Sequence, residues 1–127
     1  MFTKIHHTAI ICSDYRRSKD FYTKSLGLDP IRETYRADRD SYKLDLALNG
    51  EYVIELFSFP NVPARPTMPE ATGLRHLAFA VANLNQVIET LQSKNVFAEK
   101  IRYDEATGKH FAFIFDPDLL PIELYEL

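Results

Sequence analysis

The sequence has a single cysteine, no long apolar run and no excess of basic residues, and each absence excludes a class of protein. Cys12 has no second cysteine with which to form an internal disulfide, which is typical of the reducing cytoplasm. No stretch approaches the roughly 18 apolar residues that a membrane-spanning helix needs, and the N-terminus lacks the pattern of a signal peptide. The net charge of −3 provides no basic field for nucleic acid. We therefore expect a cytoplasmic protein that binds neither membrane nor nucleic acid.

The chain contains two pairs of similar segments. Ile5–Ile11 resembles Leu74–Ala80, and Ile54–Phe57 resembles Ile122–Tyr125. The spacing is nearly constant, because 69 positions separate the first pair and 68 separate the second. With 127 residues, 46% of them hydrophobic, the chain is long enough for one domain with a core of its own. We therefore predict a single domain over residues 1–127 that consists of module 1 at 4–59, a linker at 60–73 and module 2 at 74–127.

Both modules are predicted to fold in the order strand, helix, strand, strand, strand. Asp14 and Asn83 are typical helix N-caps, Gly27 ends the first helix, and Asn49-Gly50 favours a two-residue hairpin. The predicted strands are 5–12, 28–36, 41–48 and 51–59 in module 1 and 74–81, 96–103, 109–115 and 121–126 in module 2, and the helices are 14–26 and 83–94.

The strand predicted at 41–48 alternates leucines with other residues. Its leucines share one face, whereas Lys43, Asp45 and Ala47 share the other. This alternation is typical of a strand that packs on a core with one face and meets water with the other. We therefore expect the face of Lys43, Asp45 and Ala47 to be exposed.

The segment between the modules is rich in proline. Pro60, Pro63, Pro66 and Pro69 recur at every third position, a pattern that excludes a helix or a central strand and favours an extended chain. A stiff linker of this kind would let modules pair between two chains. We therefore expect a homodimer.

Each module carries one histidine near its start and one glutamate near its end, namely His7 and Glu55, and His76 and Glu123. Each glutamate lies in an apolar run, where burial is costly unless the carboxylate is paired or binds a metal ion. If the two modules pair about a pseudo-twofold axis, two imidazoles and two carboxylates meet. This ligand set suits one divalent metal ion, such as Ni²⁺, Co²⁺, Zn²⁺ or Mn²⁺. The sequence leaves open whether the site lies within one chain or across two.

Several motifs together resemble the vicinal-oxygen-chelate superfamily, and in particular the small glyoxalase I-like (lactoylglutathione lyase-like) proteins. They are the His-x-Ala strands, Phe21-Tyr22 near Leu26-Gly27-Leu28, the Ile-Glu-Leu strand ends and Asp116-Pro117-Asp118. The resemblance implies an α+β fold in which two βαβββ modules form a β-cup around a metal ion held by His7, Glu55, His76 and Glu123. It further implies a metal-dependent lyase or isomerase that acts on a small α-oxygenated substrate through an enediolate-type intermediate. In this reading Glu123 is the catalytic base and Glu55 its pseudo-symmetric catalytic partner.

Three positions depart from glyoxalase I. Ile11 replaces an arginine and Phe59 an asparagine, and both changes argue against glutathione binding. Leu119 follows Asp116-Pro117-Asp118 where a glycine is usual, so we expect a changed turn, because leucine tolerates positive φ poorly.

The candidate substrate contacts are arginines. Arg36, Arg39 and Arg75 could bind an acidic substrate, and each could equally be a solvated surface residue. The true substrate is then expected to be smaller than the glutathione adduct, or to carry another thiol or none.

Two alternative functions belong to the same superfamily. Another enzyme of the fold, either an extradiol dioxygenase or an antibiotic-modifying thiol transferase, would use two histidines and one glutamate, and Glu55 argues against it. A non-catalytic drug-binding protein would generally lack the metal ligands, and this chain has all four. The metal site could also serve a reaction unlike that of any relative.

Overall fold

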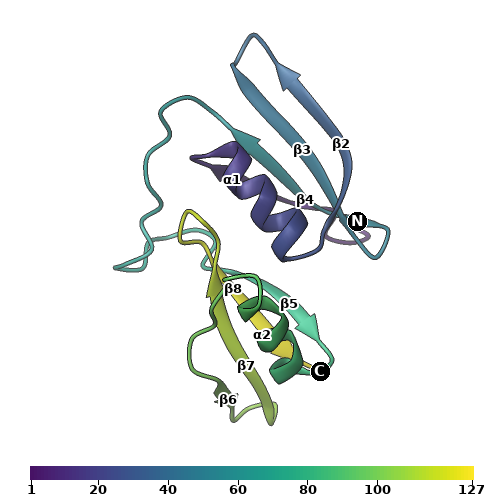
Figure 1. The fold of residues 1–127 in the computed structure, drawn as a ribbon, viewed down its shortest axis with the longest axis vertical. Coiled ribbons are helices and arrows are strands. Elements are labelled where there is room, and N and C mark those ends of the chain that lie inside the picture. The colour runs from purple at the N-terminus through teal and green to yellow at the C-terminus, as the bar shows by residue number, and fades with distance from the viewer. The chain divides into compact units, whose positions relative to one another are not determined.

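The computed structural model describes all 127 residues and divides into two compact units, Met1–Ala64 and Arg65–Leu127 (Figure 1). The first unit contains β1 (Thr8–Cys12), α1 (Tyr15–Asp20), a π-helical segment (Phe21–Ser25), β2 (Asp29–Arg36), β3 (Ser41–Leu48) and β4 (Glu51–Ser58). The second contains β5 (Leu77–Val81), α2 (Leu84–Gln92), β6 (Arg102–Asp104), β7 (Lys109–Phe115) and β8 (Pro121–Glu126). Each unit holds one module, and whether the two act as the single domain predicted for residues 1–127 stays a prediction.

The two sheets have the same topology. Their strand orders are β1-β4-β3-β2 and β5-β8-β7-β6. In each sheet the first strand of the module pairs in parallel with the last, and the other pairs are antiparallel. The predicted α+β fold with two βαβββ modules is therefore confirmed.

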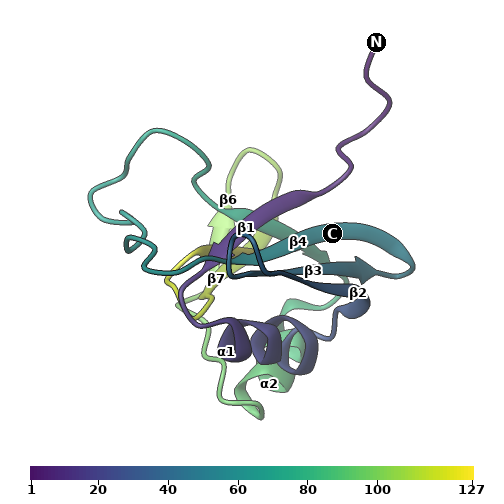
Figure 2. The ribbon, with the colours of Figure 1, turned by 90° about the horizontal axis from the view of Figure 1, so that it is seen from above.

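Each helix contacts its own sheet (Figure 2). Because successive side chains of a strand point to opposite faces, each sheet has one face toward its helix and one face away from it. The core of the first unit is Ile10, Cys12, Phe21, Tyr22, Leu28, Leu44, Leu46, Ile54 and Leu56, and that of the second is Leu84, Leu91, Ala112, Ile114, Ile122 and Leu124. On these strands the odd-numbered residues lie between the core residues. Their side chains, which include those of Glu55 and Glu123, therefore point to the face of the sheet away from the helix. Neither helix has the length and apolar character needed to cross a membrane.

The helices begin where the sequence predicts. The side chain of Asp14 accepts a hydrogen bond from the amide of Arg17 at 3.1 Å, and that of Asn83 accepts one from the amide of Gln86 at 3.0 Å. The first helix passes into a π-helical segment, in which the amide of Leu26 donates to the carbonyl of Phe21 at 2.9 Å. This wider turn explains why the apolar residues of the first helix do not follow an α-helical stripe.

Three strand predictions were too long. β1 and β5 begin at Thr8 and Leu77, where the parallel ladders with β4 and β8 begin. The strand predicted at 96–103 is reduced to Arg102–Asp104, because residues 96–101 form no regular ladder with β7. A single backbone hydrogen bond, from Glu99 to Phe113 at 2.8 Å, ties this segment to the sheet.

The linker is less extended than its prolines suggest. Turns interrupt it at 60–61 and 67–70, and Asn61 has a φ of 56°. Beyond the first turn, the guanidinium of Arg65 donates to the carbonyls of Leu74 and Arg75 at 2.9 and 3.0 Å. The expectation of a continuously extended linker is therefore wrong, because a left-handed asparagine and side-chain hydrogen bonds offset the proline pattern.

The turn between β7 and β8 keeps a left-handed residue although that residue is a leucine. Leu119 has a φ of 66°, and the carboxylate of buried Asp116 accepts hydrogen bonds from the amides of Asp118 and Leu120 at 2.9 and 2.8 Å. Thr67 adds a hydrogen bond to the carbonyl of Leu119 at 3.1 Å. The expectation that leucine would avoid positive φ here is wrong, because these hydrogen bonds impose the conformation.

Replacing Leu119 with glycine should stabilise the protein. Glycine removes the left-handed strain of leucine but adds chain entropy to the unfolded state, so the expected net gain is about 0.5–1 kcal/mol. The side chain is 62% exposed, so little packing is lost. Urea unfolding measures the change, with Leu119→Ala as the matched control, because alanine shortens the side chain and keeps the strain. Equal effects of the two variants would contradict the assignment of strain to φ.

Candidate functional site

His7 and Glu55 lie together on the sheet of module 1. His7 immediately precedes β1, and parallel pairing sets Ala9, two residues later, beside Glu55 on β4. The Nε2 atom of His7 lies 3.8 Å from Oε2 of Glu55. Because residues two apart share a face of a strand, the imidazole and the carboxylate both lie on the face opposite the helix.

The same arrangement recurs in module 2. Ala78 pairs with Glu123 in the parallel ladder of β5 and β8, and Nε2 of His76 lies 3.0 Å from Oε2 of Glu123. Both glutamates have 15% of their side chain exposed, and the histidines about one third. The structure thus forms a histidine–glutamate pair twice, at identical register.

Each pair provides two of the four metal ligands predicted from the sequence. Neither module by itself has three or more His, Cys, Asp or Glu side chains placed to hold a metal ion. Cys12 is 1% exposed and donates to the carbonyl of Phe57 at 3.2 Å. The meeting of all four ligands at one metal ion stays a prediction.

His6 is a neighbour of His7 that the sequence did not single out. Nδ1 of His6 lies 2.8 Å from Nδ1 of His7, within hydrogen-bonding distance. This contact occupies the far nitrogen of the His7 ring and leaves Nε2 toward Glu55. Hydrogen bonds of this kind orient metal-ligating imidazoles and set their tautomers.

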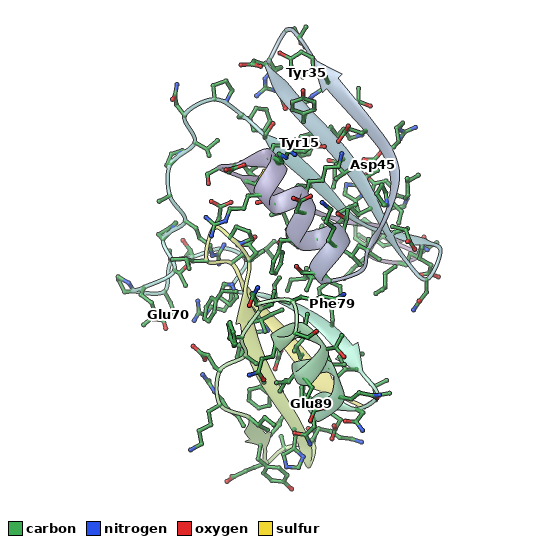
Figure 3. The ribbon with its side chains drawn as sticks, viewed as in Figure 1. Tyr15, Tyr35, Asp45, Glu70, Phe79 and Glu89 are labelled. Carbon is green, nitrogen blue, oxygen red and sulfur yellow. The ribbon has the colours of Figure 1, made fainter.

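Four polar residues of module 1 form a connected group beside Glu55, and we call Arg32, Lys43, Asp45 and Tyr52 the polar cluster. Asp45 comes from β3 (Figure 3). It lies directly across from Glu55 in the antiparallel ladder and is 1% exposed. The hydroxyl of Tyr52 lies 2.6 Å from Oδ1 of Asp45 and 3.0 Å from Oε2 of Glu55. The ammonium of Lys43 lies 3.5 Å from Asp45 and 3.4 Å from Glu55.

Asp45 corrects the expectation that its face of β3 is exposed. Arg32 covers it from β2 and binds Oδ2 of Asp45 through Nε and Nη2, at 3.2 and 2.9 Å. Tyr52 reaches it from β4, and Ala47 is buried as well. The sequence signal was an aspartate between two core leucines, and the alternation of β3 alone could not show that neighbouring strands would cover it.

A β-bulge brings Tyr52 to this face. The ladder of β3 and β4 pairs Leu46 with Ile54 but Ala47 with Tyr52, so β4 contains one extra residue, Val53. Without the bulge, Tyr52 and Glu55 would point to opposite faces, because they are three residues apart. Bulges commonly re-aim side chains beside functional sites.

The charges of the polar cluster determine its protonation. Burial raises the pKa of Asp45, but the hydrogen bonds from Tyr52 and Arg32 and the positive charges of Lys43 and Arg32 outweigh it, so the pKa lies below its usual value. Burial and the carboxylates of Asp45 and Glu55 raise the pKa of Tyr52 well above its usual value. Asp45 is therefore a carboxylate and Tyr52 a hydroxyl donor at neutral pH.

The surroundings of Glu123 are aromatic instead. Phe113 lies across from Glu123 in the ladder, at the place that Asp45 takes in module 1. The rings of His76 and Phe113 meet edge to face at 5.3 Å, and the guanidinium of Arg102 lies 5.4 Å from the centre of the Phe113 ring. The two otherwise repeated pairs thus differ in what surrounds them.

The predicted substrate contacts have different surroundings. The guanidinium of Arg36 lies 4.9 Å from the ring centre of Phe57, and that of Arg39 lies 4.7 Å from that of Phe59. Arg36 also donates to the hydroxyl of Ser41 at 2.9 Å, and its Nε is buried without a hydrogen-bond partner. These two arginines therefore lie beyond Glu55 at the end of β4, on its face of the sheet.

Arg75 differs from the other two arginines, because its guanidinium lies 3.8 Å from the carboxylate of Glu70. It neighbours His76 in sequence, and adjacent residues of an extended chain point to opposite sides. A substrate contact by any of the three arginines stays a prediction.

The repeated modules and the paired His and Glu define a known class. The family model of the Glyoxalase/Bleomycin resistance protein/Dioxygenase superfamily matches residues 4–124, and the chain belongs to this superfamily. It is 60% identical over 126 residues to the uncharacterized protein YwkD of Bacillus subtilis, covering 99% of this chain and 98% of that protein.

More distant similarity reaches an enzyme of defined activity. The lactoylglutathione lyase of Escherichia coli O157:H7 is 33% identical over 131 residues, covering 97% of this chain and 92% of the lyase. Among solved structures, a glyoxalase family protein from Enterococcus faecalis matches with a TM-score of 0.92 and 46% identity, covering 98% of each chain. The recognition of this superfamily from the sequence is therefore confirmed.

Asp45→Asn should destabilise the protein in a way that depends on pH. The lowered pKa means that the folded state favours the carboxylate of Asp45 over the protonated form. The stabilisation by this carboxylate is therefore complete above about pH 4, the pKa of aspartate in the unfolded chain. It is lost as the pH falls through the lower pKa of Asp45 in the folded state. We expect the variant to lose about 2 kcal/mol at pH 7.

Urea unfolding of the metal-free protein from pH 7 to pH 3 measures this difference, which should shrink at the acidic end. Asp38→Asn is the matched control, because Asp38 is exposed in the turn after β2. A difference for Asp45→Asn that is constant with pH would contradict the charged network.

Proposed function

We propose that the protein is a metal-dependent lyase or isomerase of glyoxalase type that acts on a small α-oxygenated substrate. The observation that carries the proposal is the histidine–glutamate pair that recurs at the same register in both modules. Two such pairs at matching places of a repeat are unexpected for residues with independent structural roles. Membership of a superfamily that contains many enzymes supports the proposal.

The residues fit a divalent metal ion. In each pair an imidazole Nε2 and a carboxylate oxygen lie within 4 Å of each other on one face of a sheet. We propose that His7, Glu55, His76 and Glu123 hold one Ni²⁺, Co²⁺, Zn²⁺ or Mn²⁺ ion, all of which accept nitrogen and oxygen ligands. When bound, the ion would supply the positive charge that stabilises the enediolate formed from the substrate.

The proton transfer is assigned to the glutamates. Removal of a proton from carbon next to a carbonyl requires a base within hydrogen-bonding reach of that carbon acid. We assign this role to Glu123, which lies across from Phe113 and has Nε2 of His76 at 3.0 Å from its carboxylate. Glu55 is the partner carboxylate, which contacts Tyr52 and Lys43.

The relatives support a glyoxalase-type reaction more than the alternatives. The lactoylglutathione lyase similarity extends over nearly the whole chain. A dioxygenase or a thiol transferase of this superfamily would leave Glu55 without a ligand role, and a non-catalytic drug-binding protein would leave both pairs unexplained. We infer further that the partner is a small molecule, that the protein forms a homodimer, and that it works in the cytoplasm, where a lone cysteine stays reduced.

The proposed ligands should separate into two classes on substitution. His7→Ala and His76→Ala remove a metal-binding nitrogen, so both should lose metal affinity and activity together. Glu123→Gln keeps a weak oxygen ligand and removes the base, so it should lower turnover more than metal content.

Metal analysis of the purified variants and a screen of metals against α-oxygenated substrates measure both effects. Glu89→Gln, on the exposed surface of α2, is the control for loss of a carboxylate. Equal loss of metal in the histidine and glutamate variants would reject this division of roles, and a wild-type protein that binds none of these metal ions would reject the proposed site.

Turnover of the glutathione hemithioacetal of methylglyoxal should be weak or absent. Ile11 is 55% exposed and Phe59 lies beneath the guanidinium of Arg39, so neither position offers the polar group that would hold glutathione. A site whose hydrogen-bonding groups are replaced by apolar ones discriminates against the polar substrate. Steady-state kinetics with several thiols checks this expectation, and kcat/KM of about 10⁴ M⁻¹s⁻¹ or more with glutathione would show a plain glyoxalase I.

A further inference from the structure

We propose that Tyr52 and Lys43 are positioning residues that fix the carboxylate of Glu55 in the orientation in which it would bind a metal ion. This inference rests on the proposed function, because it concerns two of the proposed metal ligands. It goes further by assigning a role to two side chains that lie outside the four-ligand set.

The contacts of Glu55 restrain its carboxylate. Oε2 lies 3.0 Å from the hydroxyl of Tyr52 and 3.4 Å from the ammonium of Lys43. The hydroxyl has one proton for two carboxylates, so it donates to Asp45 or to Glu55 at any moment. Lys43 lies near both and offsets the repulsion between two carboxylates that face each other across the strands.

The restraining groups are themselves held in place. Arg32 donates from Nε and Nη2 to the same oxygen of Asp45, at 3.2 and 2.9 Å. Asp45 is 1% exposed and belongs to β3, a strand paired on both sides. Tyr52 therefore binds a fixed anchor, and its hydroxyl is placed where the Val53 bulge directs it.

Module 2 has no counterpart of the polar cluster around its glutamate. The residue across from Glu123 is Phe113, at the place that Asp45 takes across from Glu55. Two residues earlier on the same strand, module 2 has Phe111 where module 1 has Lys43. The β7–β8 ladder continues without a bulge from Ile122 to Pro121. Glu123 has one polar contact within 4 Å, with His76. The duplicated framework thus gives Glu55 two polar neighbours besides its histidine and leaves Glu123 with its histidine alone.

Metal titration tests the inference. Tyr52→Phe and Lys43→Met should each weaken Co²⁺ binding roughly tenfold, as loss of a hydrogen-bonding partner of a metal ligand does. Tyr125→Phe is the matched control, because the hydroxyl of Tyr125 binds Asp104 and Thr107 and contacts no proposed ligand. The control should bind Co²⁺ like the wild type. Wild-type affinity in Tyr52→Phe, or equal loss in Tyr125→Phe, would overturn the proposal.

Crystal structures of the metal-free wild type and of metal-free Tyr52→Phe separate this inference from the proposed function. We expect one conformation of Glu55 in the wild type and a displaced side chain in the variant. An unmoved Glu55 in Tyr52→Phe would overturn the positioning role. If the wild type binds no Co²⁺ while Glu55 still moves in the variant, the proposed metal site fails and the positioning role holds.

Discussion

The parallel pairing of the first and last strands of each module is the constraint on which the candidate site depends. It sets Ala9 beside Glu55 and Ala78 beside Glu123, so that the histidine two residues earlier reaches the glutamate on the same face. A shift of one residue in either ladder would move the glutamate to the helix-facing side and bury it in the apolar core. The apolar neighbours of each glutamate, which pack on the helix side, keep the ladder in register and thus fix the geometry of the polar pair.

The two modules show how a repeated backbone carries different chemistry. The strand order, the parallel register and the histidine–glutamate spacing are conserved between the halves of the molecule. The strand beside each glutamate, however, presents Asp45 in one module and Phe113 in the other. One carboxylate is consequently surrounded by charge and hydrogen bonds, and the other by aromatic rings.

Much of the fold and the two histidine–glutamate pairs could be predicted from the sequence, because they depend on local signals or on the repeat. Hydrophobic alternation located the central strands, Asp14 and Asn83 marked the helix starts, and Asn49-Gly50, with φ values of 51° and 81°, forms the expected hairpin. Repetition of the histidine and the glutamate indicated which polar residues to consider together. The alternation, capping and turn signals hold because each one is decided within a few neighbouring residues.

What the sequence did not reveal depends on contacts between strands. The burial of Asp45 follows from Arg32 and Tyr52, which come from the strands on either side. The position of Tyr52 follows from a bulge, which no alternation pattern predicts, and the conformation of Leu119 follows from hydrogen bonds that include one from Thr67 in the linker. Residues 96–101 have the composition of a strand but make too few backbone hydrogen bonds with β7 to become one.

The bulge at Val53 has a consequence for how such a duplicated protein can diverge. One additional residue in β4 reverses the direction of the side chains between it and the Asn49-Gly50 turn, while the ladder from Ile54 onward is unchanged. An insertion or deletion of a single residue at this place would therefore exchange the side chains that face Glu55 without disturbing Glu55 itself. Length variation near the hairpin is thus a route by which related chains could acquire new chemistry around an unaltered histidine–glutamate pair.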